Sequence, residues 1–113
     1  MLKATGWWLA VQPADLRCGI DRLLGKVAAE LGHDVRDGGA YVFRNRAGTR
    51  IKLVCVDAQG VWLATRRLHQ GRFHWPRAMD AVWSLSTAQF EWLCAGVDWQ
   101  RLSSQRMALP AQL

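Results

Sequence analysis

The stretch from residue 40 to residue 68 constrains the fold most, because it alternates three β-rich runs with two short turns that contain glycine. The runs are Ala40–Asn45, Arg50–Asp57 and Val61–Leu68. β-Branched and aromatic residues favour extended backbone, and short glycine-containing turns between such runs are typical of antiparallel neighbours. The pattern predicts a three-stranded antiparallel meander.

One or two further short strands are expected outside the meander. Trp7–Val11 is apolar and aromatic and is followed by Pro13, which indicates a strand buried on both faces. Val82–Leu85 is a second short run of this kind. Both are expected to join the same antiparallel sheet.

Two main helices are predicted beside the sheet. Apolar residues recur at spacings of three and four from Leu16 to Leu31, and Asp15 is the predicted N-cap of that helix. Ser86 is the predicted N-cap of the last helix, because Gln89 stands three residues later as in a capping box. The predicted fold class is therefore α+β, an antiparallel sheet with the helices on one face.

Length and composition predict one domain without disulfide bonds and without a membrane span. The 113 residues suit a single domain, expected over 1–102, followed by a polar tail at 103–113 that is expected to be flexible. No apolar run reaches the roughly 18 residues of a membrane span, so a cytoplasmic location without membrane contact is predicted. Three widely spaced cysteines without a CxxC pair indicate neither a disulfide framework nor a zinc site.

The excess positive charge is confined to one segment. The whole chain carries a net charge of +6. Residues 44–77 hold eight basic residues and one acidic residue, a net +7, so the rest of the chain is at −1. Clustered Lys and Arg favour nucleic acid as a partner. The candidate nucleic-acid-binding residues are Arg44, Arg46, Arg50, Lys52, Arg66, Arg67 and Arg72.

Strand alternation predicts how these cations are displayed. Arg50 and Lys52 share one face of their strand, whereas Arg66 and Arg67 point to opposite faces. A suitable register would gather four or five cations on one sheet face, which would suit phosphates or guanine edges. A solvated outer face shielded by long side chains fits the same pattern. Trp75, near the end of the segment, is expected to pack in the core, with base stacking as the alternative.

Catalysis is not predicted. The nine acidic residues are scattered, and His69 and His74 lack a third metal ligand nearby in the sequence. Cys55 has no neighbouring histidine to activate its thiol. We therefore expect a protein that is not an enzyme and that uses no metal or cofactor.

An ordered set of motifs resembles one protein family over residues 8–99. Phe43-Arg44-Asn45-Arg46 is followed by Lys52-Leu53, Asp57, Gly60, Trp62-Leu63, Arg67-Leu68, Gly71-Arg72-Phe73 and Trp75-Pro76. This string resembles the TnpB accessory proteins, also called Orf2-like, of the IS sixty-six class of bacterial insertion sequences. Two positions depart from the family pattern: Val56 stands where an aromatic residue is frequent, and Cys18 where a basic residue is common.

The resemblance implies a role in transposition beside a separate DDE-type transposase and implies no catalytic residues here. Two hypotheses follow. In the first, the protein is an accessory factor that binds insertion-sequence DNA through the basic meander. In the second, it is an adaptor that docks on the transposase or another accessory subunit without touching DNA. The adaptor would use either the basic face or an apolar patch near Trp7, Trp8 and Trp99.

Overall fold

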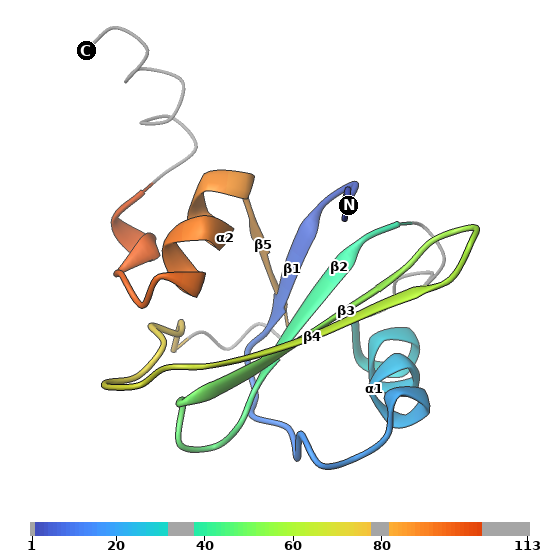
Figure 1. Ribbon diagram of the computed structural model, residues 1–113, viewed down its shortest axis with the longest axis horizontal. Helices are drawn as coiled ribbons and strands as arrows, with labels where there is room; N and C mark the ends of the chain where they lie inside the picture. Colours follow the sequence, from blue (N-terminus) through green and yellow to red (C-terminus); the bar gives the residue numbers. More distant parts are fainter. Residues whose placement is uncertain (1, 32–37, 78–81, 103–113) are drawn as a thin grey trace, which may run out of the picture.

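A five-stranded sheet forms the centre of the protein (Figure 1). The computed structural model describes residues 2–31, 38–77 and 82–102. The strand order across the sheet is β4-β3-β2-β1-β5. The strands are β1 (Trp7–Ala10), β2 (Ala40–Arg44), β3 (Arg50–Val56), β4 (Val61–Arg67) and β5 (Val82–Leu85). All five strand positions predicted from the sequence are confirmed to within one or two residues.

The sheet is mixed, which corrects the antiparallel sheet expected from the sequence. β2, β3 and β4 are successive antiparallel neighbours, and β5 pairs antiparallel with β1. β1 and β2, however, run parallel, with Trp8 beside Tyr41. A parallel pair needs a long crossover between its strands, and the segment containing the first helix supplies it.

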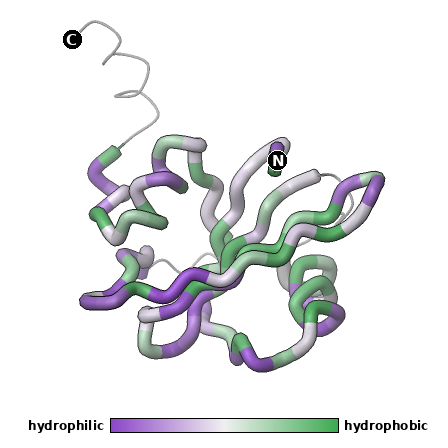
Figure 2. Tube along the Cα trace, in the orientation of Figure 1, coloured by the Kyte–Doolittle hydropathy of each residue, from purple (hydrophilic) through white to green (hydrophobic). Residues whose placement is uncertain are grey.

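The helices cover opposite faces of the sheet, which corrects the prediction of a single helical face (Figure 1). Helix α1 (Ile20–Lys26), with its π-helical continuation η1 (Val27–Leu31), packs on the face that carries Tyr41 and Phe43. Helix α2 (Thr87–Cys94) and the 3-10 turn η2 (Trp99–Arg101) pack on the face that carries Val42. β2 is buried from Ala40 to Phe43, so both of its faces need cover, and Figure 2 shows hydrophobic residues gathered in the middle of the sheet.

Helix α1 begins later than the sequence suggested. Its N-cap is Gly19, which has no side-chain cap, and not Asp15. The Asp15 carboxylate instead accepts a hydrogen bond from the backbone N–H of Arg17 at 3.0 Å, and the backbone N–H of Cys18 donates to the Asp15 carbonyl at 3.1 Å. Aspartate that bonds its own following backbone favours a turn over helix initiation. The predicted end of this helix at Gly32 lies outside the described residues, as does the tail at 103–113.

Helix α2 begins as predicted. The Ser86 hydroxyl oxygen accepts from the backbone N–H of Gln89 at 3.1 Å, and the Gln89 side-chain oxygen accepts from the backbone N–H of Ser86 at 2.9 Å. The helix ends before Gly96, whose φ of 78° is the left-handed conformation that glycine adopts without strain. Trp99 then packs into the core with 1% of its surface exposed.

Candidate nucleic-acid interface

The register of the sheet divides the predicted cations between two faces. β3 and β4 are aligned so that Arg50 lies opposite Arg67 and Ile51 lies opposite Arg66. Residues directly opposite each other project to the same face. Arg50, Lys52 and Arg67 therefore project from the α1 face, and Arg44 and Arg66 from the α2 face. The single basic sheet face that alternation suggested does not form.

Arg44 contributes to the fold. Its Nη2 donates to the carbonyl oxygen of Val11 at 3.4 Å, and its guanidinium carbon lies 5.8 Å from the centre of the Trp75 ring. Desolvation lowers the pKa of Arg44 from its ordinary value. The Trp75 indole N–H in turn donates to the Ala10 carbonyl at 2.9 Å. Both side chains therefore fasten the post-β4 segment to β1, and the core-packing interpretation of Trp75 is favoured over base stacking.

Two further candidates are bonded to backbone carbonyls. The Lys52 ammonium donates to the Leu16 carbonyl at 2.8 Å, which ties β3 to the segment before α1. Arg66 Nε donates to the Cys94 carbonyl at 2.7 Å, at the C-terminal end of α2. A cation there also complements the partial negative charge of the helix end. Both cations therefore position neighbouring elements of the fold.

The remaining four candidates surround the turn between β2 and β3. All four are exposed. Arg72 reaches the turn from the segment after β4: a Cβ placed on Gly48 would lie 3.7 Å from the Arg72 Cβ. Within the described part of the chain, no ion pair or side-chain hydrogen bond engages their guanidinium groups. We call this set the basic rim; it comprises Arg46, Arg50, Arg67 and Arg72.

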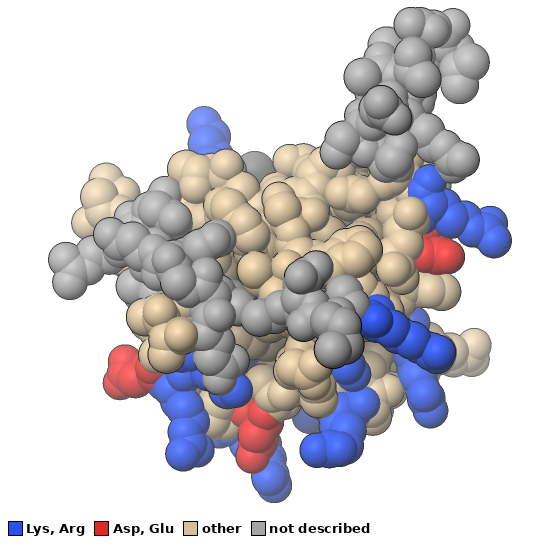
Figure 3. All heavy atoms as spheres, turned by 180° about the vertical axis from the view of Figure 1, so that it is seen from behind, with Lys and Arg blue, Asp and Glu red and all other residues tan. Residues whose placement is uncertain are grey.

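Positive side chains are visible along one border of the molecule. Figure 3 shows Lys and Arg gathered along the lower edge, with few acidic side chains between them. In Figure 1 that lower edge holds the β2–β3 turn and the segment before α1. On the side of the molecule that Figure 3 shows, positive side chains are therefore most numerous at the end of the sheet that holds this turn.

Asn45 holds the β2–β3 turn in shape. Its side-chain oxygen accepts from the backbone N–H groups of Thr49 and Arg50 at 3.0 and 3.1 Å, and its amide donates to the Thr49 hydroxyl at 3.1 Å. Gly48 supplies a positive φ of 74°, and its carbonyl accepts from the backbone N–H of Phe73 at 2.8 Å. The backbone that carries the basic rim is therefore fixed by hydrogen bonds on both sides of the turn.

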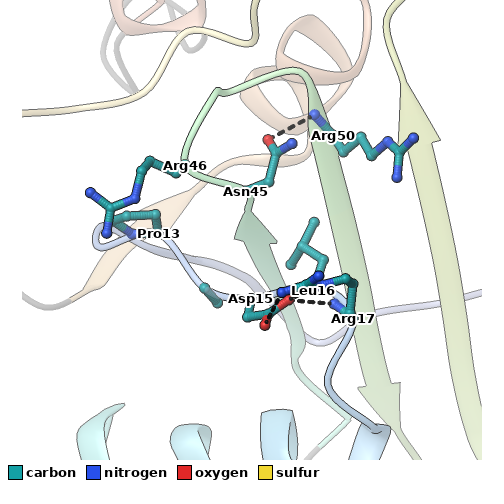
Figure 4. A pocket seen from close by; sticks show the side chains of 8 residues that line it. Pro13, Asp15, Leu16, Arg17, Asn45, Arg46 and Arg50 are labelled. Carbon is teal, nitrogen blue, oxygen red and sulfur yellow. Dashed lines mark hydrogen bonds and ion pairs between the residues drawn. The ribbon is translucent and has the colours of Figure 1, made fainter.

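Two hollows lie on either side of Arg50. One, of about 430 Å³, is drawn in Figure 4 and includes Arg17, Arg46 and Arg50 in its lining. The other, of about 510 Å³, includes Arg50, Arg67 and His69. Sequence reasoning missed Arg17, which lies far from the basic segment along the chain and reaches the hollow only through the fold.

Arg17 is neutralised by the one acidic side chain that lines the first hollow. Arg17 Nε donates to the Asp15 carboxylate at 3.0 Å, and Nη2 donates to its other oxygen at 3.1 Å. These side-chain hydrogen bonds are the main cause that lowers the pKa of Asp15 to about 2. The pair leaves Arg46 and Arg50 as the uncompensated charges of this hollow.

The chemistry of the site is that of anion binding. Four exposed guanidinium groups can each present paired N–H donors to phosphate oxygens. Within the described residues, no group of three His, Cys, Asp or Glu side chains is placed to hold a metal ion, and no helix is long and apolar enough to cross a membrane. Burial raises the pKa of the Cys94 thiol, which disfavours the reactive thiolate.

The apolar patch suggested for an adaptor is largely used within the fold. Trp99 is buried, and its indole N–H donates to the His74 carbonyl at 2.7 Å. Trp7 stacks on Phe90 with ring centres 4.0 Å apart. Trp8 stacks on a β2 aromatic ring on the other face. These tryptophans anchor helices and strands to the sheet.

Comparison with known proteins places this chain in a family. Residues 5–104 match the model of the family described as IS66 Orf2 like protein. A relative from Sinorhizobium fredii, Uncharacterized protein y4hO, is 40% identical over 93 residues, covering 82% of this chain and 81% of the relative. Uncharacterized protein y4jC of the same organism is 31% identical over 105 residues, covering 93% of this chain and 90% of the relative. No solved structure matches. The family match confirms the resemblance found in the motifs: this chain belongs to the IS66 Orf2-like family of insertion-sequence-associated proteins.

Proposed function

We propose that this protein is a non-catalytic accessory factor of transposition that binds insertion-sequence DNA through the basic rim. The observation that carries the proposal is the set of four exposed arginines around one rigid turn, whose guanidinium groups have no partner within the described residues. Arg50 and Arg67 lie directly opposite each other across two strands. Like charges so placed repel and destabilise the sheet unless a polyanion or solvent compensates them.

The rim is suited to the phosphate backbone more than to base edges. Its cations come from a turn, a strand start, a strand end and a loop, so they spread around one end of the sheet without forming a row along a strand. The turn that carries them is short and held by Asn45, which limits the ordering cost of binding. Contacts to phosphates position a protein on DNA without reading sequence directly.

The structure changes which residues make an informative test. Arg44 and Lys52 donate to the carbonyls of Val11 and Leu16, so their substitution would disturb the fold as well as any interface. Arg46 and Arg50 have exposed side chains and lie in the lining of the same hollow. A variant with Arg46→Ala and Arg50→Ala removes two rim charges and leaves the carbonyl contacts in place.

The experiment measures binding to duplex DNA from insertion-sequence ends as a function of salt, by fluorescence anisotropy. Each phosphate contact contributes about −0.9 to the slope of the logarithm of the binding constant against the logarithm of the salt concentration. The double variant loses two such contacts, so the magnitude of this slope should fall by about 2. The matched control, Lys3→Ala with Arg101→Ala, removes two exposed charges far from the rim along the chain. It should keep the wild-type slope. Absence of DNA binding by the wild type at about 50 mM salt, where such binding is strongest, contradicts the proposal.

The adaptor hypothesis is separated by the same variants. A DDE-type transposase or another transposition protein is the expected partner in that case. If the rim variant keeps its DNA affinity but loses co-purification with the transposase, the rim is a protein-docking surface and the DNA proposal is wrong. If DNA affinity falls while transposase binding persists, the adaptor role of the rim is excluded.

A further inference from the structure

Strand β4 is an edge strand that lacks cover on both faces. All seven of its residues are exposed, whereas the neighbouring β3 is mostly buried. Val61, Trp62 and Leu63 expose 48%, 44% and 49% of their surfaces. Within residues 2–31, 38–77 and 82–102, no strand pairs with the outer side of β4. An exposed apolar edge with unpaired backbone groups is a template for another strand.

The other edge of the sheet is different. β5 has four residues, and its Leu85 is 5% exposed and belongs to the same core cluster as Leu93 of α2. β4 has seven exposed residues, and it meets a helix at its end, where Arg66 donates to the Cys94 carbonyl of α2. The incoming strand is therefore expected at β4.

The residues of β4 divide into an apolar half and a basic half. Val61, Trp62 and Leu63 precede the central Ala64, and Arg66 and Arg67 end the strand. This division makes the strand complementary to itself in only one direction. Parallel pairing of two copies in register would place each arginine against the same arginine of the second copy, and like charges directly opposite are destabilising.

Antiparallel pairing centred on Ala64 removes that repulsion. It places Val61 opposite Arg67 of the second copy, and Trp62 opposite Arg66 of the second copy. Trp62 and Arg66 lie on the same face of β4, since they are four residues apart in a strand. Because Arg66 Nε donates to the Cys94 carbonyl, the aliphatic stem of Arg66 is the part that lies beside the exposed indole of the second copy, where it covers apolar surface.

We infer that β4 pairs antiparallel with β4 of a second copy of this chain, in a register centred on Ala64. The pairing joins the two five-stranded sheets into one sheet of ten strands and covers the exposed residues Val61, Trp62 and Leu63. Of the basic rim, Arg67 lies in the paired strand, whereas Arg46 and Arg50, the two residues substituted in the DNA-binding experiment, lie outside it. The two experiments therefore change different residues and can fail independently.

The sign of a charge placed at Val61 tests the register. Antiparallel pairing brings residue 61 against Arg67 of the second copy, so Val61→Glu forms two symmetry-related opposite-charge pairs and Val61→Lys forms two like-charge pairs. The full-length Glu variant should dimerise more tightly than the Lys variant by on the order of tenfold, measured by sedimentation equilibrium. In a parallel in-register pair, residue 61 meets itself, and both substitutions would weaken the dimer alike.

Ser84 provides the matched control, because it is exposed and lies in the opposite edge strand. Ser84→Glu and Ser84→Lys should leave the dissociation constant of the dimer equal within about twofold. Oxidative cross-linking gives an independent readout: Ala64→Cys should form a disulfide-linked dimer, because residues directly opposite across two strands have Cα atoms within disulfide range. Val61→Cys should not, because the two copies of residue 61 lie at opposite ends of the paired strands.

The outcomes are decisive in both directions. A concentration-dependent dimer that is tighter with Glu than with Lys at position 61, and that cross-links through position 64, supports the inference. A chain that stays monomeric up to about 200 μM overturns the inference, and β4 would then be an edge for a strand of a different protein. A dimer that responds equally to both charges at position 61 also overturns it.

Discussion

Asn45 should contribute more to the free energy of unfolding than any arginine of the basic rim, although its side chain carries no charge. It makes three hydrogen bonds of 3.0 to 3.1 Å within the β2–β3 turn, two to backbone N–H groups and one to the Thr49 hydroxyl. A typical intramolecular hydrogen bond contributes about 0.5–1.5 kcal/mol net, and water can replace part of each in a half-exposed turn. Asn45→Ala should therefore lower the free energy of unfolding by about 2 kcal/mol.

The assay is urea unfolding followed by tryptophan fluorescence, with the slope m compared between variants so that only the midpoint changes. Thr49→Val removes one of the three hydrogen bonds and should cost about 1 kcal/mol or less. Asn45→Asp keeps the side-chain oxygen that both backbone N–H groups use, so it should retain most of the stability. Because it adds a negative charge beside Arg46 and Arg50, it should still weaken DNA binding.

The two Asn45 variants therefore separate stability from affinity. If Asn45→Ala costs less than about 0.5 kcal/mol, hydrogen bonds from this side chain do not hold the turn, and the argument for a rigid rim is wrong. If Asn45→Asp binds DNA as tightly as the wild type, the negative charge is not felt by the ligand, and the rim is not the binding surface.

Two further predictions concern local interactions. Ser86→Ala removes the hydroxyl that accepts from the backbone N–H of Gln89, and it should lower the free energy of unfolding by about 1 kcal/mol. If urea unfolding shows a change below about 0.3 kcal/mol, the capping box does not stabilise helix α2. The Asp15 carboxyl, with a pKa of about 2 in the folded chain against an ordinary value of 3.8, should contribute stability that is present above pH 3.8 and is lost as the pH falls through about 2. NMR titration should show this pKa returning toward 3.8 in Arg17→Ala; an unchanged pKa would mean that Arg17 is not its cause.

The amino-acid sequence by itself determined the local elements of this protein. The five strand positions and the Ser86 capping box follow from propensity, alternation and turn chemistry over a few neighbouring residues, and the structure agrees with them. The confinement of the positive charge to residues 44–77 is likewise a property of the sequence alone. The ordered motifs of the same segment indicated the family, which the comparison confirmed.

Non-local contacts limited the prediction of the candidate site. Arg44, Lys52 and Arg66 have the same local pattern as the rim arginines, but each donates to a carbonyl that lies 33, 36 or 28 residues away along the chain. No short sequence pattern encodes which carbonyl approaches which cation. The parallel pairing of β1 with β2 was equally hard to predict, because the direction in which two strands separated by a helix pair depends on how that helix packs.

Only the tertiary structure decided how the charge is displayed. Alternation assigns each side chain to a face of its own strand, but the register between strands decides which faces coincide, and here it divides the cations between two faces. The folding of the post-β4 segment against the β2–β3 turn then brings Arg72 beside Gly48 and gathers four arginines at one end of the sheet. The sequence therefore determined that the charge is clustered, and long-range packing decided which part of that cluster remains exposed.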